Sequence, residues 1–159
     1  RGNVETRLRK LDEGGYDVVV LAAAGLIRLG FSDRISAHLS YHECLPAPGQ
    51  GIVAIKIRAA DPVTAQVVRQ LSNQPTMTAL KAERALVTAL GGGCQVPIGA
   101  ITLPTDEGLI LTAVVASPDG KQILRRQEQG STRNATELGL KVAKQLIADG
   151  AADILARCQ

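Results

Sequence analysis

The stretch Leu90-Gly91-Gly92-Gly93-Cys94-Gln95-Val96-Pro97-Ile98-Gly99 marks the point where a helical pattern changes into an extended one. Glycine tolerates positive φ, so Gly91 suits the position just after a helix C-terminus. Pro97 fixes φ and favours extended backbone around it. The stretch therefore predicts a helix, a pliable loop that carries Cys94, and a strand. The residues alone leave two interpretations of Cys94: a small buried side chain in a turn, or a thiol displayed for covalent chemistry.

The residues on both sides of this loop predict a small α+β domain over 76–159. Upstream, apolar residues recur at helical spacing as far as Leu90, with Thr76 or Thr78 as the N-cap. Downstream, turn signals at Asp106-Glu107-Gly108 and Pro118-Asp119-Gly120 separate three apolar runs. They predict a three-stranded antiparallel sheet covered by helices, with strands near 96–103, 109–116 and 122–129. A capping box, Asn134-Ala135-Thr136-Glu137, predicts a helix to Asp149, and a last helix is expected over 152–158.

The preceding region, residues 1–72, alternates helical and apolar extended patterns, which predicts part of an α/β domain. Asp17 to Ala23 is a continuous β-branched run typical of a buried parallel strand. Asn3 and Asp61-Pro62 are helix-start signals, whereas Leu45 to Gly51 is rich in Pro and Gly and indicates a loop. Helices are expected over 4–13, 24–30, 33–39 and 61–71, and further strands over 39–44 and 52–58. The polar connector Ser72 to Thr76 is the predicted domain boundary.

The composition excludes several classes of function. The 159 residues are 45% hydrophobic and 21% charged, an ordinary globular balance. Aromatic residues make up 2% and the net charge is only +3, so nucleic-acid binding by base stacking is not indicated. No apolar run reaches transmembrane length, and no signal peptide is present. Three well-separated cysteines indicate neither a disulfide framework nor a zinc site, and they suit the cytoplasm. His38 and His42 lack a third ligand, so no metal site is predicted.

The loop Gly91-Gly92-Gly93-Cys94-Gln95-Val96-Pro97-Ile98-Gly99 resembles the cofactor-attachment signature of the porphobilinogen deaminases, also called hydroxymethylbilane synthases. Further matches to that family follow in the right order and spacing. They are Arg1-Gly2-Asn3-Val4-Glu5-Thr6-Arg7-Leu8, Leu21-Ala22-Ala23-Ala24-Gly25-Leu26-Ile27-Arg28-Leu29-Gly30, Leu45-Pro46-Ala47-Pro48-Gly49-Gln50-Gly51, Ala82-Glu83-Arg84-Ala85 and Ser117-Pro118-Asp119-Gly120. The ordered set covers the chain from end to end and is highly specific.

The resemblance implies a transferase of tetrapyrrole (haem) biosynthesis that condenses four porphobilinogens into hydroxymethylbilane. A dipyrromethane cofactor, linked by a thioether to Cys94, would act as the primer. Sulfur is the best side-chain nucleophile for the soft azafulvene carbon that forms when porphobilinogen loses ammonia. The preceding helix points its C-terminus at the loop, so its dipole does not lower the thiol pKa, and basic groups elsewhere must activate it.

The resemblance also implies binding residues. Arginines at positions 1, 7 and 28 match family residues that bind the carboxylates of substrate and cofactor, for which bidentate guanidinium groups are suited. From the residues alone, the favoured interpretation of Arg1, Arg7 and Arg28 is three solvated surface charges, which is usual for arginines on helices. Asn3 would cap its helix, donate to the same carboxylates, or do both. Ala22, Gln50 and Gly51 match positions that line the cofactor cavity, while Gly51 also suits a turn and Gln50 could satisfy loop backbone.

Two departures from the family pattern limit these expectations. Lys56 stands where the family commonly has Glu, which puts docking of the first domain in doubt. In the family, the strand and helix that end residues 1–72 cross back into the first domain. The family's catalytic aspartate and the lysine beside it lie in the N-terminal part of that domain, which this chain does not match. We therefore expect a C-terminal portion, comprising part of domain two and all of domain three, that is inactive alone. Whether this portion itself carries the cofactor stays open.

The expected partners are porphobilinogen, the growing linear oligopyrrole and the missing N-terminal domain, in cis or as a separate chain, with no nucleic acid and no membrane. The alternative is a non-catalytic anion-binding or interaction module that has kept the fold.

Overall fold

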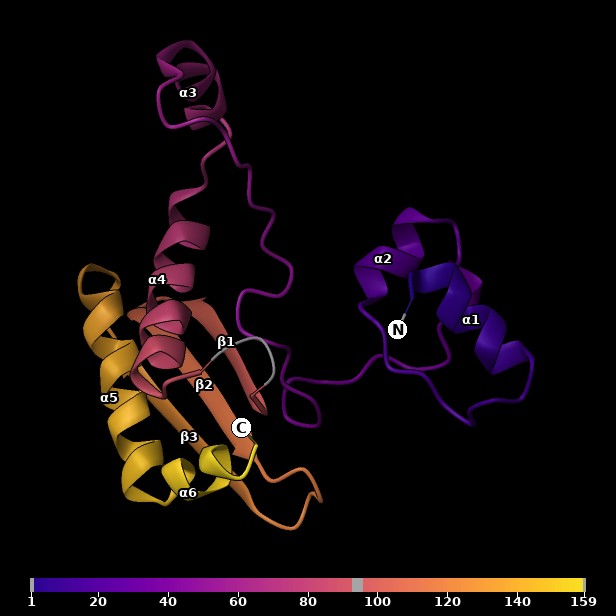
Figure 1. The fold of residues 1–159 in the computed structure, drawn as a ribbon. Helices are drawn as coiled ribbons and strands as arrows, with labels where there is room; N and C mark the ends of the chain where they lie inside the picture. Colours follow the sequence, from indigo (N-terminus) through magenta and orange to yellow (C-terminus); the bar gives the residue numbers. More distant parts are fainter. Residues whose placement is uncertain (1, 93–95, 159) are drawn as a thin grey trace. The chain divides into compact units, whose positions relative to one another are not determined.

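The computed structural model describes residues 2–92 and 96–158. The chain divides into two compact units, residues 1–40 and residues 41–159 (Figure 1). The second unit contains the sheet and the larger helices, whereas the described part of the first contains short helices only.

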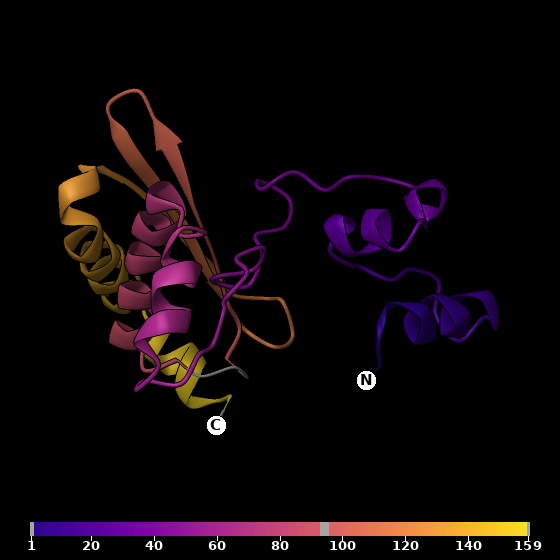
Figure 2. The same cartoon turned by 90° about the horizontal axis from the view of Figure 1, so that it is seen from above.

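The second unit is built on a three-stranded antiparallel sheet in the order β1-β2-β3. The strands are β1 (Ile98–Thr105), β2 (Gly108–Ala116) and β3 (Ile123–Gly130). Helices α4 (Gln74–Ala89) and α5 (Ala135–Ala148) pack together on one face of this sheet, and α6 (Ala151–Ala156) follows α5 (Figures 1 and 2). The predicted α+β domain with a helix-covered sheet is therefore confirmed.

The core of this unit lies between the sheet and the two long helices. Its largest fully buried side chains come from three elements: Leu86 of α4, Leu111 and Val115 of β2, and Val142 and Leu146 of α5. Alternate residues of β2 point into this core, as expected for a sheet with one covered face.

The helices α4 and α5 approach each other closely at Gly139. A Cβ atom at this position would lie 2.2 Å from the Ala82 carbonyl oxygen and 2.9 Å from the Ala85 Cβ. Only glycine fits such a contact between two backbones. Gly139 therefore sets the distance between the helices.

The ends of the elements in this unit differ in part from the predictions. The α4 helix begins earlier than expected, because Asn73 rather than Thr76 or Thr78 accepts the capping hydrogen bond, from the Thr76 amide at 2.9 Å. The Asn134 side chain makes no capping bond, so the predicted capping box is wrong. Instead, the Ser131 hydroxyl accepts from the Arg133 amide and starts a 3₁₀ turn, η2 (Thr132–Asn134), that leads into α5. Both predicted hairpin turns are confirmed, with two residues between β1 and β2.

The first unit contains α1 (Val4–Asp12), α2 (Ala23–Arg28) and the 3₁₀ turn η1 (Ser32–Arg34). Leu8 and Leu26 are its buried side chains. The predicted strand at 17–23 is wrong for this structure: residues 17–22 are irregular, and Val18 is 75% exposed. The helix expected over 33–39 is reduced to η1.

The strands expected at 39–44 and 52–58 are also absent: residues 41–43 form a turn and residues 52–58 are irregular. A strand needs a neighbouring strand that bonds to its backbone N–H and C=O groups. Among the described residues, no strand pairs with either of these two segments. Several of their apolar side chains are exposed, Val53 to 88% and Ile55 to 51%. The following helix, α3 (Pro62–Arg69), is capped by Asp61 as predicted, but its apolar residues Val63 and Val67 are likewise exposed.

Candidate functional site

The first unit places two of the predicted arginines on neighbouring helices. Arg7 lies in the second turn of α1, and Arg28 is the last residue of α2. The two helices touch near Val4 and Gly25, where a Cβ on the glycine would lie 3.7 Å from the valine side chain. Both arginines are exposed. Arg1 lies outside the described residues.

These two arginines differ from their neighbours in what they bind. Arg9 pairs with Glu13 at 3.1 Å, and both terminal nitrogens of Arg34 reach the Asp12 carboxylate. Neither Arg7 nor Arg28 forms an ion pair within the described parts of the chain; Arg7 donates from Nε to the Gly2 carbonyl oxygen at 3.1 Å. Their guanidinium groups therefore remain able to bind an external anion.

Asn3 and Ala22 lie at the starts of the two helices. The Asn3 Oδ1 accepts from the Thr6 amide at 2.9 Å, which confirms its interpretation as the N-cap of α1. Ala22 precedes α2 and is exposed. Asn3, Arg7, Ala22 and Arg28 are thus brought onto one pair of touching helices.

The second unit holds the other predicted cavity residues, Gln50 and Gly51, in the Pro- and Gly-rich loop. Two consecutive turns shape this loop: the Gln50 amide donates to the Ala47 carbonyl oxygen at 2.9 Å, and the Ile52 amide to that of Gly49 at 3.1 Å. Gly49 and Gly51 have φ of 74° and 85°, values that favour glycine, so the turn role predicted for Gly51 is confirmed. Both Gln50 and Gly51 are exposed.

Three groups fix the segment that contains this loop to the sheet domain. Arg125 of β3 donates to the carbonyl oxygens of Tyr41 and His42, at 2.9 and 3.0 Å. The Ala100 amide of β1 donates to the Pro46 carbonyl oxygen at 2.9 Å. Glu83 of α4 accepts from the Gly49 amide at 2.7 Å. The loop is therefore part of the second unit.

Glu83 is a residue that the sequence prediction missed. It is only 5% exposed, although glutamate is seldom buried. The signal was available in the helical spacing, because Glu83 lies three residues from both Leu80 and Leu86 and so falls on the apolar face of α4.

The described residues on both sides of Cys94 are tightly held, while Cys94 itself lies outside the described residues. Gly91 follows α4 with φ 67°, which confirms the predicted helix-ending glycine. The Gly92 amide donates to the Val87 carbonyl oxygen at 2.9 Å, and a Cβ on Gly92 would lie 2.9 Å from the Ile98 side chain. On the far side, the Ala116 amide of β2 donates to the Pro97 carbonyl oxygen at 3.2 Å. Both ends of the Cys94 segment are thus anchored.

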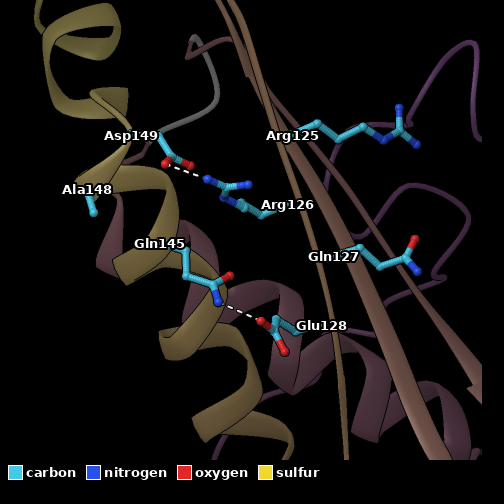
Figure 3. Close-up of a pocket in the computed structure, with 7 residues that line it drawn as sticks. All are labelled: Arg125, Arg126, Gln127, Glu128, Gln145, Ala148 and Asp149. Carbon is cyan, nitrogen blue, oxygen red and sulfur yellow. Dashed lines mark hydrogen bonds and ion pairs between the residues drawn. The ribbon is translucent and has the colours of Figure 1, made fainter.

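A pocket of about 350 Å³ lies between β3 and α5, and none of the described residues that line it is a predicted site residue (Figure 3). Its charged side chains already have partners: Arg126 pairs with Asp149 at 2.6 Å, Glu128 pairs with Lys141 at 2.8 Å, and Arg125 donates to the Tyr41 and His42 carbonyl oxygens. The hydrogen bonds from Lys141 and Gln145 hold the pKa of the Glu128 carboxyl below its ordinary value. The charged side chains that line this pocket are therefore already bonded within the protein, which argues against a ligand site here.

Three further observations concern Lys56, metal binding and membrane-spanning helices. Lys56 is exposed and forms no ion pair within residues 2–92 and 96–158. The same residues contain no group of three or more His, Cys, Asp or Glu side chains placed to hold a metal ion. Among the helices described, none has the length and apolar character needed to cross a membrane.

Two protein-family models match the chain. Residues 1–66 match the model described as porphobilinogen deaminase, dipyromethane cofactor binding domain, and residues 77–148 match that of porphobilinogen deaminase, C-terminal domain. A porphobilinogen deaminase of Desulforudis audaxviator is 48% identical over 157 residues, 99% of this chain and 51% of the relative. One from Moorella thermoacetica is 46% identical over 155 residues, 98% of this chain and 50% of the relative. The chain therefore spans about half the length of the curated relatives it matches.

Proposed function

This chain belongs to the porphobilinogen deaminase family, and we propose that it is the C-terminal part of an enzyme that condenses four porphobilinogens into hydroxymethylbilane with loss of ammonia. The observation that carries the proposal is the pair of family matches, which take in residues 1–66 and 77–148. The relatives that bear this enzyme's name are 46% to 48% identical over nearly the whole chain.

Arg7 and Arg28, with Arg1, are proposed to bind the acetate and propionate groups of the pyrroles. The donor set fits such a ligand, because exposed guanidinium groups without an ion pair among the described residues bind carboxylates in a bidentate manner. Each added pyrrole brings further carboxylates, so a growing chain needs several such cations. Asn3 combines its capping role with a donor amide that lies on the same helix pair.

Cys94 is proposed to hold the dipyrromethane through a thioether bond, and Ala22, Gln50 and Gly51 are proposed to line its cavity. When bound, the dipyrromethane supplies the primer to which further pyrrole units are added. The matched family description for residues 1–66 names this cofactor. Anchored residues on both sides of Cys94 would keep the thioether on the sheet domain while the oligopyrrole lengthens.

The domain organisation and partners are part of the same proposal. The boundary is proposed at residues 72–76, which is supported by the interval between the two matched ranges. The catalytic aspartate of the family would come from an N-terminal part, in cis or on a separate chain, and the enzyme would work in the cytoplasm. The 159-residue chain alone is then inactive, because the group that stabilises the cationic transition state is not on it.

The test is porphobilinogen consumption by the whole protein encoded by the gene that contains this chain. The unaltered protein and the control variant Cys44→Ser, which alters an exposed free thiol, should turn over substrate. Cys94→Ser and the 159-residue chain should not. Unchanged turnover in Cys94→Ser would refute the anchor, and turnover by the short chain would refute its inactivity. An inactive whole protein would favour the non-catalytic module.

A further inference from the structure

The outer edge of β1 has no neighbouring strand among the described residues, and other groups accept from its backbone amides. β1 pairs with β2 on one side only, so its alternate backbone N–H groups at positions 98, 100 and 102 point away from the sheet. The Ala100 amide donates to the Pro46 carbonyl oxygen, and the Thr102 amide donates to Glu83 Oε1 at 2.8 Å. Position 104 is a proline and has no donor. A loop and one carboxylate thus take the place of a neighbouring strand.

Glu83 uses both carboxylate oxygens for this closure. Oε1 accepts from Thr102 of β1, and Oε2 accepts from Gly49 of the Pro- and Gly-rich loop at 2.7 Å. A buried carboxylate is costly unless each oxygen is hydrogen-bonded, and bonds from amides to a charged acceptor are stronger than neutral ones. Glu83 therefore ties three elements together: its own helix α4, the edge of β1, and the loop.

The Gly49 end of this tie lies directly before Gln50 and Gly51, two of the proposed cavity residues. Gly49 accepts from the Ile52 amide with its carbonyl oxygen while its own amide is held by Glu83. Gln50 and Gly51 lie between these two fixed points. The Glu83 carboxylate is therefore one of the contacts that fix Gln50 and Gly51, together with the bond from the Gln50 amide to the Ala47 carbonyl oxygen.

We propose that Glu83 is a positioning residue for the transfer reaction, in which its buried carboxylate holds the Gly49–Gly51 loop so that Gln50 and Gly51 meet the pyrrole chain. This inference rests on the proposed function of that loop. The same helix reaches Gly91 eight residues later, at the start of the Cys94 segment. The helix α4 thus carries the residue that binds the loop and also leads into the segment that contains Cys94.

The first test measures hydrogen exchange of individual amides in the 159-residue chain and needs no ligand. In the unaltered chain, the Gly49 and Thr102 amides should be protected; exchange at the rate of an open loop would refute the tie. Glu83→Gln keeps the size of the side chain but turns one acceptor into a donor, so at least one of the two bonds is lost. We expect about tenfold faster exchange at one or both amides. Glu137→Gln, the same change at an exposed position of α5, should leave both rates within twofold.

The second test separates positioning from a merely structural role. In the whole protein, Glu83→Gln should lower kcat/KM for porphobilinogen about tenfold, the effect of one such hydrogen bond, and Glu137→Gln should not. If Glu83 acts through the loop, adding Glu83→Gln to Gln50→Ala should cost less than twofold more, because the two changes remove one function. Fully additive losses would refute positioning.

The two tests fail separately. If Glu83→Gln speeds exchange of the Gly49 amide but leaves kcat/KM unchanged, Glu83 holds the loop but its role in the reaction is refuted. An inactive unaltered protein would refute the proposed function and the positioning with it, while the exchange result would still decide whether Glu83 holds the loop.

Discussion

Replacing Gly139 by alanine tests the packing that holds α4, and with it Glu83, in place. The added Cβ would lie 2.2 Å from the Ala82 carbonyl oxygen and 3.0 Å from the Leu86 backbone nitrogen. These are backbone atoms, so no side-chain rotation can relieve the contact. Since ordinary van der Waals contact begins near 3.4 Å, the two helices must separate by about 1 Å at this point.

The expected cost follows from two opposing effects. Overpacking of a well-packed core costs about 1 to 3 kcal/mol, and a forced shift of two backbones belongs at the upper end. Alanine is the better helix former, which returns about 1 kcal/mol. The net loss in the free energy of unfolding is therefore about 2 kcal/mol.

Urea unfolding followed by far-UV circular dichroism measures this loss, and it suits a chain that has no tryptophan. With a slope of about 2 kcal/mol/M, the midpoint should fall by about 1 M. Lys144→Ala, at an exposed position of the same helix, should change stability by less than about 0.5 kcal/mol. A Gly139→Ala variant as stable as the unaltered chain would show that α4 and α5 do not meet as closely as described.

Three further predictions concern caps, pH and charge. Asn73→Ala should cost about 1 kcal/mol in urea unfolding, whereas Asn134→Ala, which removes no capping bond, should cost much less; equal losses would contradict the assigned caps. The folded-state pKa of Glu128 is lowered, so its stabilising effect is complete above its ordinary value of 4.5 and is lost as pH falls through the folded value. Unfolding of Glu128→Gln should thus differ from that of the unaltered chain at pH 7 and converge with it in acid; a constant difference would refute the assignment. In the whole protein, Arg7→Lys should raise KM for porphobilinogen about tenfold, and Arg9→Lys, already ion-paired on the same helix, less than twofold; equal effects of the two changes would refute a specific role for the Arg7 guanidinium.

The features that the sequence predicted well are those decided by a few neighbouring residues. Asn3 and Asp61 cap their helices because an Asn or Asp oxygen reaches an amide three residues ahead. Gly91 ends α4, and Gly120 turns the β2–β3 hairpin, because both adopt positive φ. The turn signals at Asp106-Glu107-Gly108 and Pro118-Asp119-Gly120 identified the three strands of the sheet in the same local way.

The features that it missed depend on distant partners. The runs at 17–23 and 52–58 have strand composition, yet composition supplies no neighbour to pair their backbones. Asn134 matched the capping-box pattern, but Ser131 formed the competing turn three residues earlier. Glu83 appeared as part of a family motif without a role, because its partners Gly49 and Thr102 lie 34 and 19 residues away.

The mass of the Cys94 peptide from the whole protein shows whether this loop anchors the primer. After proteolysis, we expect a pyrrole-containing adduct on the peptide that holds Cys94, and unmodified thiols on those that hold Cys44 and Cys158. An unmodified Cys94, or an adduct on another cysteine, would contradict the claim that this glycine-rich loop anchors the primer.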